Sequence, residues 1–193
     1  MEKSLFQITV NKDIEVSLLE EKHAPEMFAL IEANRESLRR WLPWVDTTLT
    51  LDDSKTFIMR ATDQFYSDTG VHCAVFYEGR MAGIIGCVKM DLANRCCEIG
   101  YWLGDAYRGM GLMTAVCSAL LDYLFDSLIM NRAEIRCAVD NVKSIAVPLR
   151  LGFKKEGVIR QAAWLNDRFI DLAIYGMLSK DWLERKKSGQ NWP

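Results

Sequence analysis

The chain has 193 residues, 50% of them hydrophobic, and its 24 Lys and Arg against 26 Asp and Glu leave a formal net charge of −2. This length predicts a single domain over residues 1–193, and the charge balance lacks the basic footprint that nucleic acid or an anionic membrane would attract. No apolar run reaches the roughly 18 residues that span a bilayer, and the first residues lack a signal-peptide core, so we expect a cytoplasmic protein.

Cysteine and histidine usage narrows the possible chemistry. The six cysteines form no CxxC pair, and the two histidines, His23 and His72, show no metal-binding spacing. A disulfide scaffold, a zinc site and a His-based triad are therefore not expected, and the cysteines are predicted to be small buried side chains.

The first half of the chain predicts a strand, two helices and three further strands. Residues 14–20 alternate as a strand, and residues 23–42 have helical spacing that Pro43 ends. Asp52 or Asp53 is placed to cap a second helix over 51–68. The runs on either side of "EGR" (78–80) predict a hairpin, and residues 95–104 predict the next strand.

The second half predicts a helix over 112–127, a strand over 132–140 and a helix over 141–151 that Gly152 ends. Two strands then flank the turn "LNDR", and the charged tail "ERKKSGQNWP" is expected to fray. The order predicts an α/β (α+β) protein with a mostly antiparallel sheet and one crossover that can be parallel.

The stretch "DAYRGMGLMT" (105–114) lies between a predicted strand and a predicted helix. Gly109 and Gly111 let backbone N–H groups turn toward an anion, the helix start adds its dipole, and Arg108 adds a full positive charge. Together these features suit a pyrophosphate, although an ordinary strand-to-helix loop remains an open alternative. Neither the Walker pattern nor the complete dinucleotide fingerprint is present.

The loop resembles the [Q/R]-x-x-G-x-[G/A] loop of the GNAT superfamily of N-acetyltransferases, with Met113 at the final position. The RimJ/RimL-like branch, which acetylates ribosomal-protein N-termini, tolerates Met there. Four further segments are similar to this branch: "LRRWLPWV", "EIGYWLG", "VDNVKSIAVPLRLGF" and "AAWLNDRFIDLAIYGM". The resemblance implies the GNAT fold, a central mixed, mostly antiparallel twisted sheet of about seven strands flanked by about four helices.

The resemblance also implies acetyl-coenzyme A as the acetyl donor and no metal. Pantetheine would lie in a wedge beside the free backbone groups of Trp102 and Leu103, where one N–H can stabilise an oxyanion. Asn141 is a further expected cofactor contact. The pyrophosphate would be held by Arg108, Gly109, Met110, Gly111, Leu112 and Met113.

Glu98 is the candidate general base. Its strand neighbours in "CCEIGYW" are apolar or small, so partial burial would raise its pKa, and alternation puts Gly100 and Trp102 on the same face. A solvated or salt-bridged strand residue is the alternative. The branch can place another carboxylate where Ala163 stands here, so a water chain or no dedicated base also stays open.

Ser144 is the candidate general acid. Many GNAT enzymes use a Tyr at the position that is Pro148 here, and Ser144 lies one turn earlier on the same side of the helix. Because proline removes a helical N–H, the sequence predicts a distorted helix or a freed carbonyl near Ser144 that meets another partner. The alternative is a hydroxyl that bonds back to a carbonyl near residue 140.

Trp41, Trp44 and Trp164 are expected either to wall the acceptor groove or to be core residues. The acceptor would be the N-terminus of a protein or, alternatively, a small amine such as a polyamine, an amino acid or an amino-sugar drug. A non-catalytic coenzyme A-binding module, favoured by Ala163, and a dinucleotide-binding protein are further alternatives. Exposed aromatics and the hairpin edge are compatible with a homo-oligomer.

Overall fold

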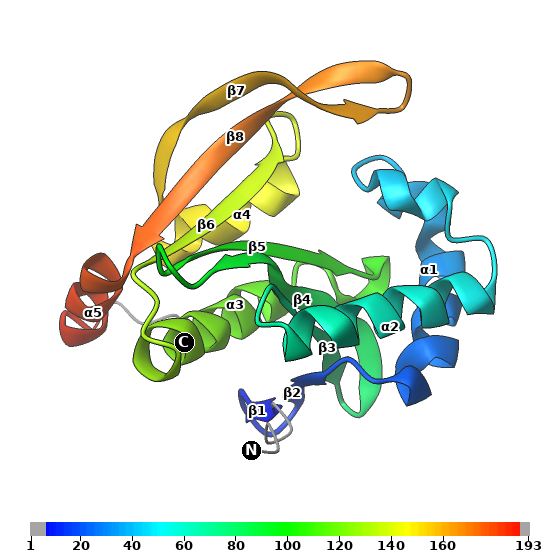
Figure 1. The fold of residues 1–193 in the computed structure, drawn as a ribbon, viewed down its shortest axis with the longest axis horizontal. Coiled ribbons are helices and arrows are strands. Elements are labelled where there is room, and N and C mark those ends of the chain that lie inside the picture. Colours follow the sequence, from blue (N-terminus) through cyan, green and yellow to red (C-terminus); the bar gives the residue numbers. More distant parts are fainter. Residues whose placement is uncertain (1–6, 190–193) are drawn as a thin grey trace.

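The computed structural model describes residues 7–189, which form one twisted sheet with helices against it (Figure 1). The strands are β1 (Gln7–Thr9), β2 (Ile14–Leu18), β3 (Val71–Tyr77), β4 (Arg80–Asp91), β5 (Cys96–Leu103), β6 (Arg132–Ala138), β7 (Lys154–Leu165) and β8 (Arg168–Leu178). The α-helices are α1 (Ala24–Leu38), α2 (Leu51–Tyr66), α3 (Leu112–Asp122), α4 (Val142–Leu151) and α5 (Ser179–Lys187). No helix among these residues is long and apolar enough to cross a membrane.

The strand order is β1-β2-β3-β4-β5-β6-β8-β7, and β5 with β6 is the parallel pair of this otherwise antiparallel sheet. The predicted class, the antiparallel hairpins and the parallel crossover are confirmed. The sheet has eight strands rather than about seven, because the short strand β1 extends it at one edge. Three residues are too few to produce a readable alternation.

The C-terminal tail departs from the prediction, because residues 179–187 form helix α5 instead of a frayed end. Trp182 is buried, and its indole Nε1 donates to Asp122 Oδ1 at 2.9 Å. Lys186 Nζ lies 2.7 Å from the same carboxylate oxygen. One buried aromatic therefore anchors a helix whose other residues are mostly polar. The last four residues of the predicted tail lie outside the described range.

The cap of α2 is also corrected. The N-cap is Thr50, not Asp52 or Asp53. Thr50 Oγ1 accepts from the Asp53 N–H at 3.3 Å, and the Asp53 carboxylate accepts from the Thr50 N–H at 2.8 Å. Asp53 is thus the second half of a capping box, in which the two side chains satisfy each other's backbone donors.

The two faces of the sheet bury separate apolar clusters. The α3 and α4 side includes Ile99, with Tyr101 packed against the cluster. The α1 and α2 side includes Ile84, with Trp102 packed against it. Neighbouring β5 residues therefore face opposite sides, as strand alternation predicts.

The sheet opens into a fork between β5 and β6. Pairing of these strands ends at Ile99 with Ile135, so residues 100–103 have no partner on that side. A β-bulge around Val88 shifts the β4–β5 register at this level, and bulges increase local strand twist. Figure 1 shows β6, β8 and β7 leaving the plane of β5 beyond this point. The fork is the predicted wedge.

Candidate active site

A cavity of about 190 Å³ lies at the fork. From the α3 and α4 side it is lined by Tyr101, Cys137 and Ser144. From the other side it is lined by Trp41 and Trp164 among others. Because its walls come from both faces of the sheet, the cavity passes between the separated strands. Two reactants can therefore approach one another from opposite sides of the sheet.

The loop before α3 has the backbone that its glycines predict. Gly109 has φ +80 and Gly111 has φ +76, a left-handed region that side chains with a Cβ rarely adopt. Helix α3 begins at Leu112 without a side-chain cap, so the N–H groups of its first turn have no acceptor within the helix. A Cβ built at Gly109 would meet nothing within 4 Å. The glycine thus leaves open space in front of anion-binding backbone.

Within the same loop, Arg108 is held by its neighbours. Its Nη1 lies 2.5 Å from Asp105 Oδ1, and its Nη2 donates to the Leu103 carbonyl at 3.2 Å. Met110 is exposed, whereas the side chains of Leu112 and Met113 are buried. Arg108 therefore links the end of β5 to the glycine-rich turn. The loop residues do not line the fork cavity.

Asn141 and Ser144 lie together at the start of α4. Asn141 is the N-cap, and its Oδ1 accepts from the Ser144 N–H at 3.2 Å. The Ser144 hydroxyl lies 3.5 Å from the Tyr101 hydroxyl and also hydrogen-bonds the Cys137 thiol. Burial raises the pKa of that thiol to about 11, and the bond from Ser144 opposes the shift. The Ser144 hydroxyl thus contacts cavity-lining residues.

Tyr101 is a site residue that the sequence analysis missed. Its hydroxyl donates to the main-chain carbonyl of Ser144 at 2.9 Å. In a regular α-helix the N–H of residue 148 would donate to this carbonyl, but residue 148 is proline and has no N–H. The partner expected for a freed carbonyl near Ser144 is therefore present. Burial raises the pKa of Tyr101 well above its usual value, so the phenol keeps its proton.

Glu98 is half-buried beside the cavity and does not line it. Its Oε2 lies 3.5 Å from Arg136 Nε, which also donates to Glu134 Oε1 at 2.6 Å. Burial raises the pKa of Glu98, Arg136 opposes this shift, and the charge of Glu134 adds to it. The Glu98 carboxyl group is thus both partly buried and salt-bridged, the two environments that the sequence analysis gave as alternatives. Arg136 itself lines the cavity.

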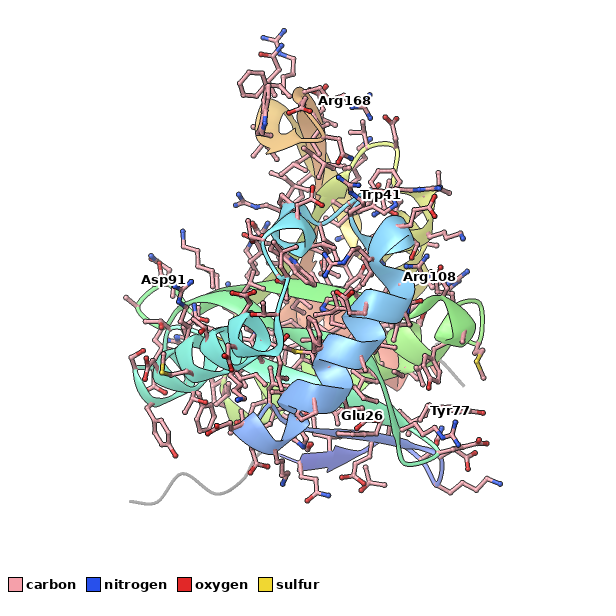
Figure 2. The ribbon with its side chains drawn as sticks, turned by 90° about the vertical axis from the view of Figure 1, so that its right-hand side faces the viewer. Glu26, Trp41, Tyr77, Asp91, Arg108 and Arg168 are labelled. Carbon is pink, nitrogen blue, oxygen red and sulfur yellow. The ribbon has the colours of Figure 1, made fainter. Side chains whose placement is uncertain are left out.

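The predicted tryptophans occupy two different places. Trp41 and Trp164 line the cavity, whereas Trp44 packs on Trp102 with ring centroids 5.9 Å apart. Asn166, at the β7–β8 turn, donates to the Arg40 carbonyl at 3.4 Å and so joins the hairpin to the Trp41 segment. Figure 2 shows Trp41 below the raised hairpin that carries Arg168. Ala163, where a carboxylate could have stood, also lines the cavity.

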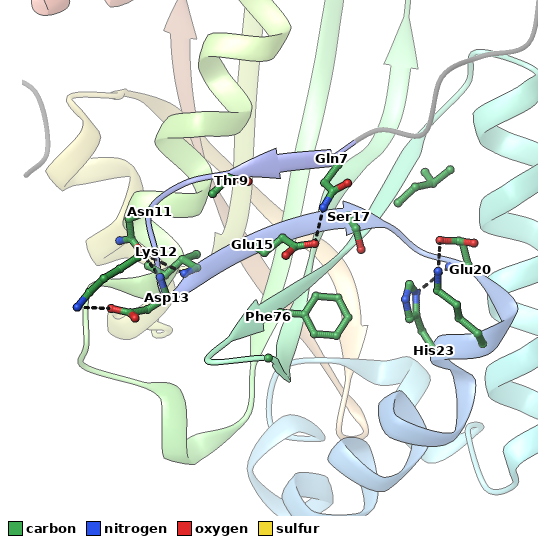
Figure 3. A pocket seen from close by; sticks show the side chains of 14 residues that line it. Gln7, Thr9, Asn11, Lys12, Asp13, Glu15, Ser17, Glu20, His23 and Phe76 are labelled. Atoms are coloured by element: carbon green, nitrogen blue, oxygen red, sulfur yellow. Dashed lines mark hydrogen bonds and ion pairs between the residues drawn. The ribbon is translucent and has the colours of Figure 1, made fainter.

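A larger cavity of about 440 Å³ lies along β1, β2 and the start of α1 (Figure 3). Its charged residues form local pairs, such as Lys22 with Glu20 at 2.8 Å and Lys12 with Asp13 at 4.0 Å. His23 Nδ1 accepts from the Glu20 N–H at 3.0 Å, and burial lowers the pKa of this histidine. This cavity holds neither the glycine-rich loop nor the fork, so we place the active site at the smaller one.

Residues 14–154 match the family model for the acetyltransferase (GNAT) domain. The chain belongs to the GNAT acetyltransferase family. It is 36% identical to the Bacillus subtilis (strain 168) protein YdaF, provisionally assigned as a ribosomal N-acetyltransferase, over 92% of this chain and 98% of that protein.

Two solved structures are similar over most of their length. One is RimL, the ribosomal L7/L12 alpha-N-protein acetyltransferase in complex with coenzyme A, with a TM-score of 0.89, 26% identity and coverage of 91% of this chain and 99% of that one. The other is the microcin C7 self-immunity acetyltransferase MccE in complex with acetyl-coenzyme A and AMP, with a TM-score of 0.86, 32% identity and coverage of 89% and 95%. This GNAT protein is therefore an acyltransferase that uses acetyl-coenzyme A.

The structure fits this donor. The fork leaves strand edges unpaired next to the cavity, and the glycine loop presents unpaired N–H groups with open space before them. Among residues 7–189, no group of three or more His, Cys, Asp or Glu side chains could hold a metal ion.

Proposed function

We propose that this GNAT protein transfers an acetyl group from acetyl-coenzyme A to the N-terminal α-amine of a ribosomal protein. The observation that carries the proposal is the cavity at the fork, which Ser144 lines from one side and Trp41 and Trp164 line from the other. An aromatic wall suits a flexible peptide end, because apolar contacts can guide it, and Glu98 beside the cavity is a carboxylate that can attract its cationic amine. The ribosomal-protein acetyltransferases among the similar proteins support this acceptor.

The thioester supplies an activated acyl carbon, and the residues around the fork supply position and proton transfer. We assign the pyrophosphate to Arg108 and the backbone of 109–113, and pantetheine to the free edge at Trp102 and Leu103, with Asn141 beside it. The amine nitrogen forms the new N–C bond as the C–S bond breaks. Holding both groups in one narrow passage accounts for much of the acceleration.

Two side chains would move the protons. Glu98 takes the proton lost by the amine, through a water because the carboxyl group stands outside the cavity lining, and its raised pKa suits this role. The Ser144 hydroxyl passes a proton to the departing sulfur and regains one from water. Trp41 and Trp164 contact the acceptor. Trp44 takes part indirectly, by packing on Trp102.

A small acceptor is the second candidate. The observation that favours it is the similarity to MccE, whose structure contains AMP as well as acetyl-coenzyme A. A cavity of about 190 Å³ could hold a compact amine, and Arg136 on its wall offers a positive charge to an acidic group.

Coenzyme A release with a panel of acceptors tests the proposal. Peptides with the N-terminal sequences of ribosomal proteins are compared with the same peptides blocked at the α-amine, and with polyamines, amino acids, amino sugars and aminoacyl nucleotides. We expect release with the free peptides alone and a mass increase of one acetyl group on their first residue. Faster release with a small amine would refute the ribosomal acceptor.

We further propose that residues 1–193 act as one domain in the cytoplasm, where ribosomal proteins are made. One sheet running from β1 to β7 supports the single domain. The exposed aromatic pair Trp164 and Phe169, with ring centroids 4.8 Å apart on the hairpin, supports a homo-oligomer. Sedimentation at working concentration tests this last point.

A further inference from the structure

Helix α4 contains a proline in its interior, and the hydrogen bond that this proline removes is replaced from another element. In a regular helix the N–H of residue 148 would donate to the carbonyl of Ser144, but Pro148 has no N–H. Tyr101, on β5, donates its hydroxyl to that carbonyl at 2.9 Å. A hydrogen bond within the helix is thus replaced by one across the fork, between β5 and α4, which both flank the cavity.

The replacement also determines where the Ser144 side chain lies. Tyr101 reaches the carbonyl from the cavity side, and its oxygen stands 3.5 Å from the Ser144 hydroxyl oxygen. That separation exceeds the roughly 2.5–3.0 Å of a good O–H···O bond, so the serine proton is not committed to the phenol. The Asn141 side chain holds the same residue from its N–H at 3.2 Å. Ser144 is therefore fixed at both main-chain groups, while its hydroxyl makes only the long contact to the phenol and a hydrogen bond to the Cys137 thiol.

Burial makes this arrangement stable over the working pH range. The pKa of Tyr101 is raised well above its usual value, so the phenol does not ionise and remains a donor. A buried carbonyl without a donor is costly, which favours keeping the phenol on it. Tyr101 is accordingly poorly suited to give its own proton away, and its contribution is to hold Ser144 in place.

We propose that Tyr101 is a positioning residue for the acetyl transfer: by taking over the hydrogen bond that Pro148 removes, it aligns the Ser144 hydroxyl with the fork. The inference rests on the proposed role of Ser144 as proton donor. It assigns to Tyr101 and Pro148 a joint function that neither residue has alone, because the phenol matters only while the helix lacks its own donor.

A double-mutant cycle tests the proposal. Tyr101→Phe removes the hydroxyl and keeps the ring, and Pro148→Ala restores an N–H that can donate to the Ser144 carbonyl. We expect Tyr101→Phe to lower kcat by roughly tenfold to a hundredfold, as a displaced catalytic group does, with the KM for acetyl-coenzyme A nearly unchanged. In the Pro148→Ala background the same substitution is expected to cost less than about threefold.

Tyr175→Phe is the matched control. Tyr175 is a buried tyrosine on β8, which β6 separates from β5, and no hydrogen bond among the described residues joins it to α4. Its substitution should leave kcat unchanged in both backgrounds. Melting temperatures are measured for every variant, and kcat is measured well below the lowest of them. A melting temperature that falls in Tyr101→Phe while kcat stays at the wild-type value would mean a purely structural role and would overturn the proposal.

Ser144→Ala separates this inference from the function on which it rests. If Ser144→Ala slows turnover and Tyr101→Phe adds no further loss in that background, Tyr101 acts through Ser144, as proposed. If Ser144→Ala keeps wild-type turnover, the assigned proton donor is wrong. If Ser144→Ala is slow but Tyr101→Phe is as fast as wild type, or is not rescued by Pro148→Ala, the positioning role alone is refuted.

Discussion

Gly109 provides the sharpest test of the cofactor loop, because the chain offers a control glycine with almost the same backbone. Gly109 has φ +80 and Gly79, at the β3–β4 turn, has φ +75, and a Cβ at either position meets nothing within 4 Å. A Cβ in the left-handed region costs about 1–2 kcal/mol at either site. We therefore expect Gly109→Ala and Gly79→Ala to lower the melting temperature equally, by about 2–8 °C in a domain of this size.

Binding should distinguish the two variants. If the backbone at Gly109 contacts the pyrophosphate, the new methyl group occupies space that the anion needs and removes at least one charge-assisted bond of about 1.5–3 kcal/mol. Gly109→Ala should then weaken coenzyme A binding by roughly 10-fold to just over 100-fold, and Gly79→Ala should leave it unchanged.

Calorimetric titration with coenzyme A measures this difference, and turnover with acetylpantetheine provides a second readout. Acetylpantetheine lacks the pyrophosphate, so Gly109→Ala should use it as well as Gly79→Ala does. Equal coenzyme A affinity in the two variants would show that the loop does not bind the pyrophosphate.

Three further outcomes are expected. Burial raises the pKa of Glu98, so its neutral form stabilises the fold at low pH, and this contribution is lost as the pH rises through the raised value. At pH values above the ordinary glutamate pKa of 4.5, Glu98→Gln should therefore have a higher melting temperature than the wild type. The variant should also lose the acidic limb of the pH profile of kcat, and a retained limb would mean that another group is the base. Trp41→Ala should raise the KM of the acceptor without affecting coenzyme A, whereas Trp44→Ala, which removes a ring packed on Trp102, should mainly lower the melting temperature; the reverse pattern would exchange their assignments. Trp182→Ala should cost about 3–5 kcal/mol of unfolding free energy, measured by urea denaturation, because the side chain is buried, and unchanged stability would contradict its role as the anchor of α5.

Local patterns in the sequence predicted most elements because each pattern has a local physical cause. Gly152 ends α4 at φ +82, a conformation that glycine adopts without penalty. Alternation in "EIGYW" agrees with the opposite faces on which Tyr101 and Trp102 pack, and the closing turn formed where "LNDR" predicted it. Elements without a local cause were missed. Helix α5 depends on one tryptophan packing against α3, which a mostly charged segment does not reveal.

The features of the candidate site also divide into those that adjacent residues encode and those that depend on tertiary contacts. The glycine-rich loop was predictable, since left-handed glycines followed by a helix start are encoded in adjacent residues. The Thr50 cap was also encoded locally, because Thr50 and Asp53 have the spacing of a capping box, although Asp52 or Asp53 was predicted as the cap. Which tryptophan faces the cavity was not encoded locally. Trp41 and Trp44 are three residues apart, and it is Trp41, next to the hairpin contact at Arg40, that lines the cavity together with Trp164.

The family, the order of most elements and the loss of a helical donor at Pro148 could all be read from adjacent residues of the sequence. Tertiary structure alone decided which group replaces that donor. Tyr101 and Ser144 are 43 positions apart, and they meet because the parallel pairing of β5 with β6 brings the start of α4 over the end of β5. A missing N–H is a property of one residue, whereas its replacement depends on how separate elements pack.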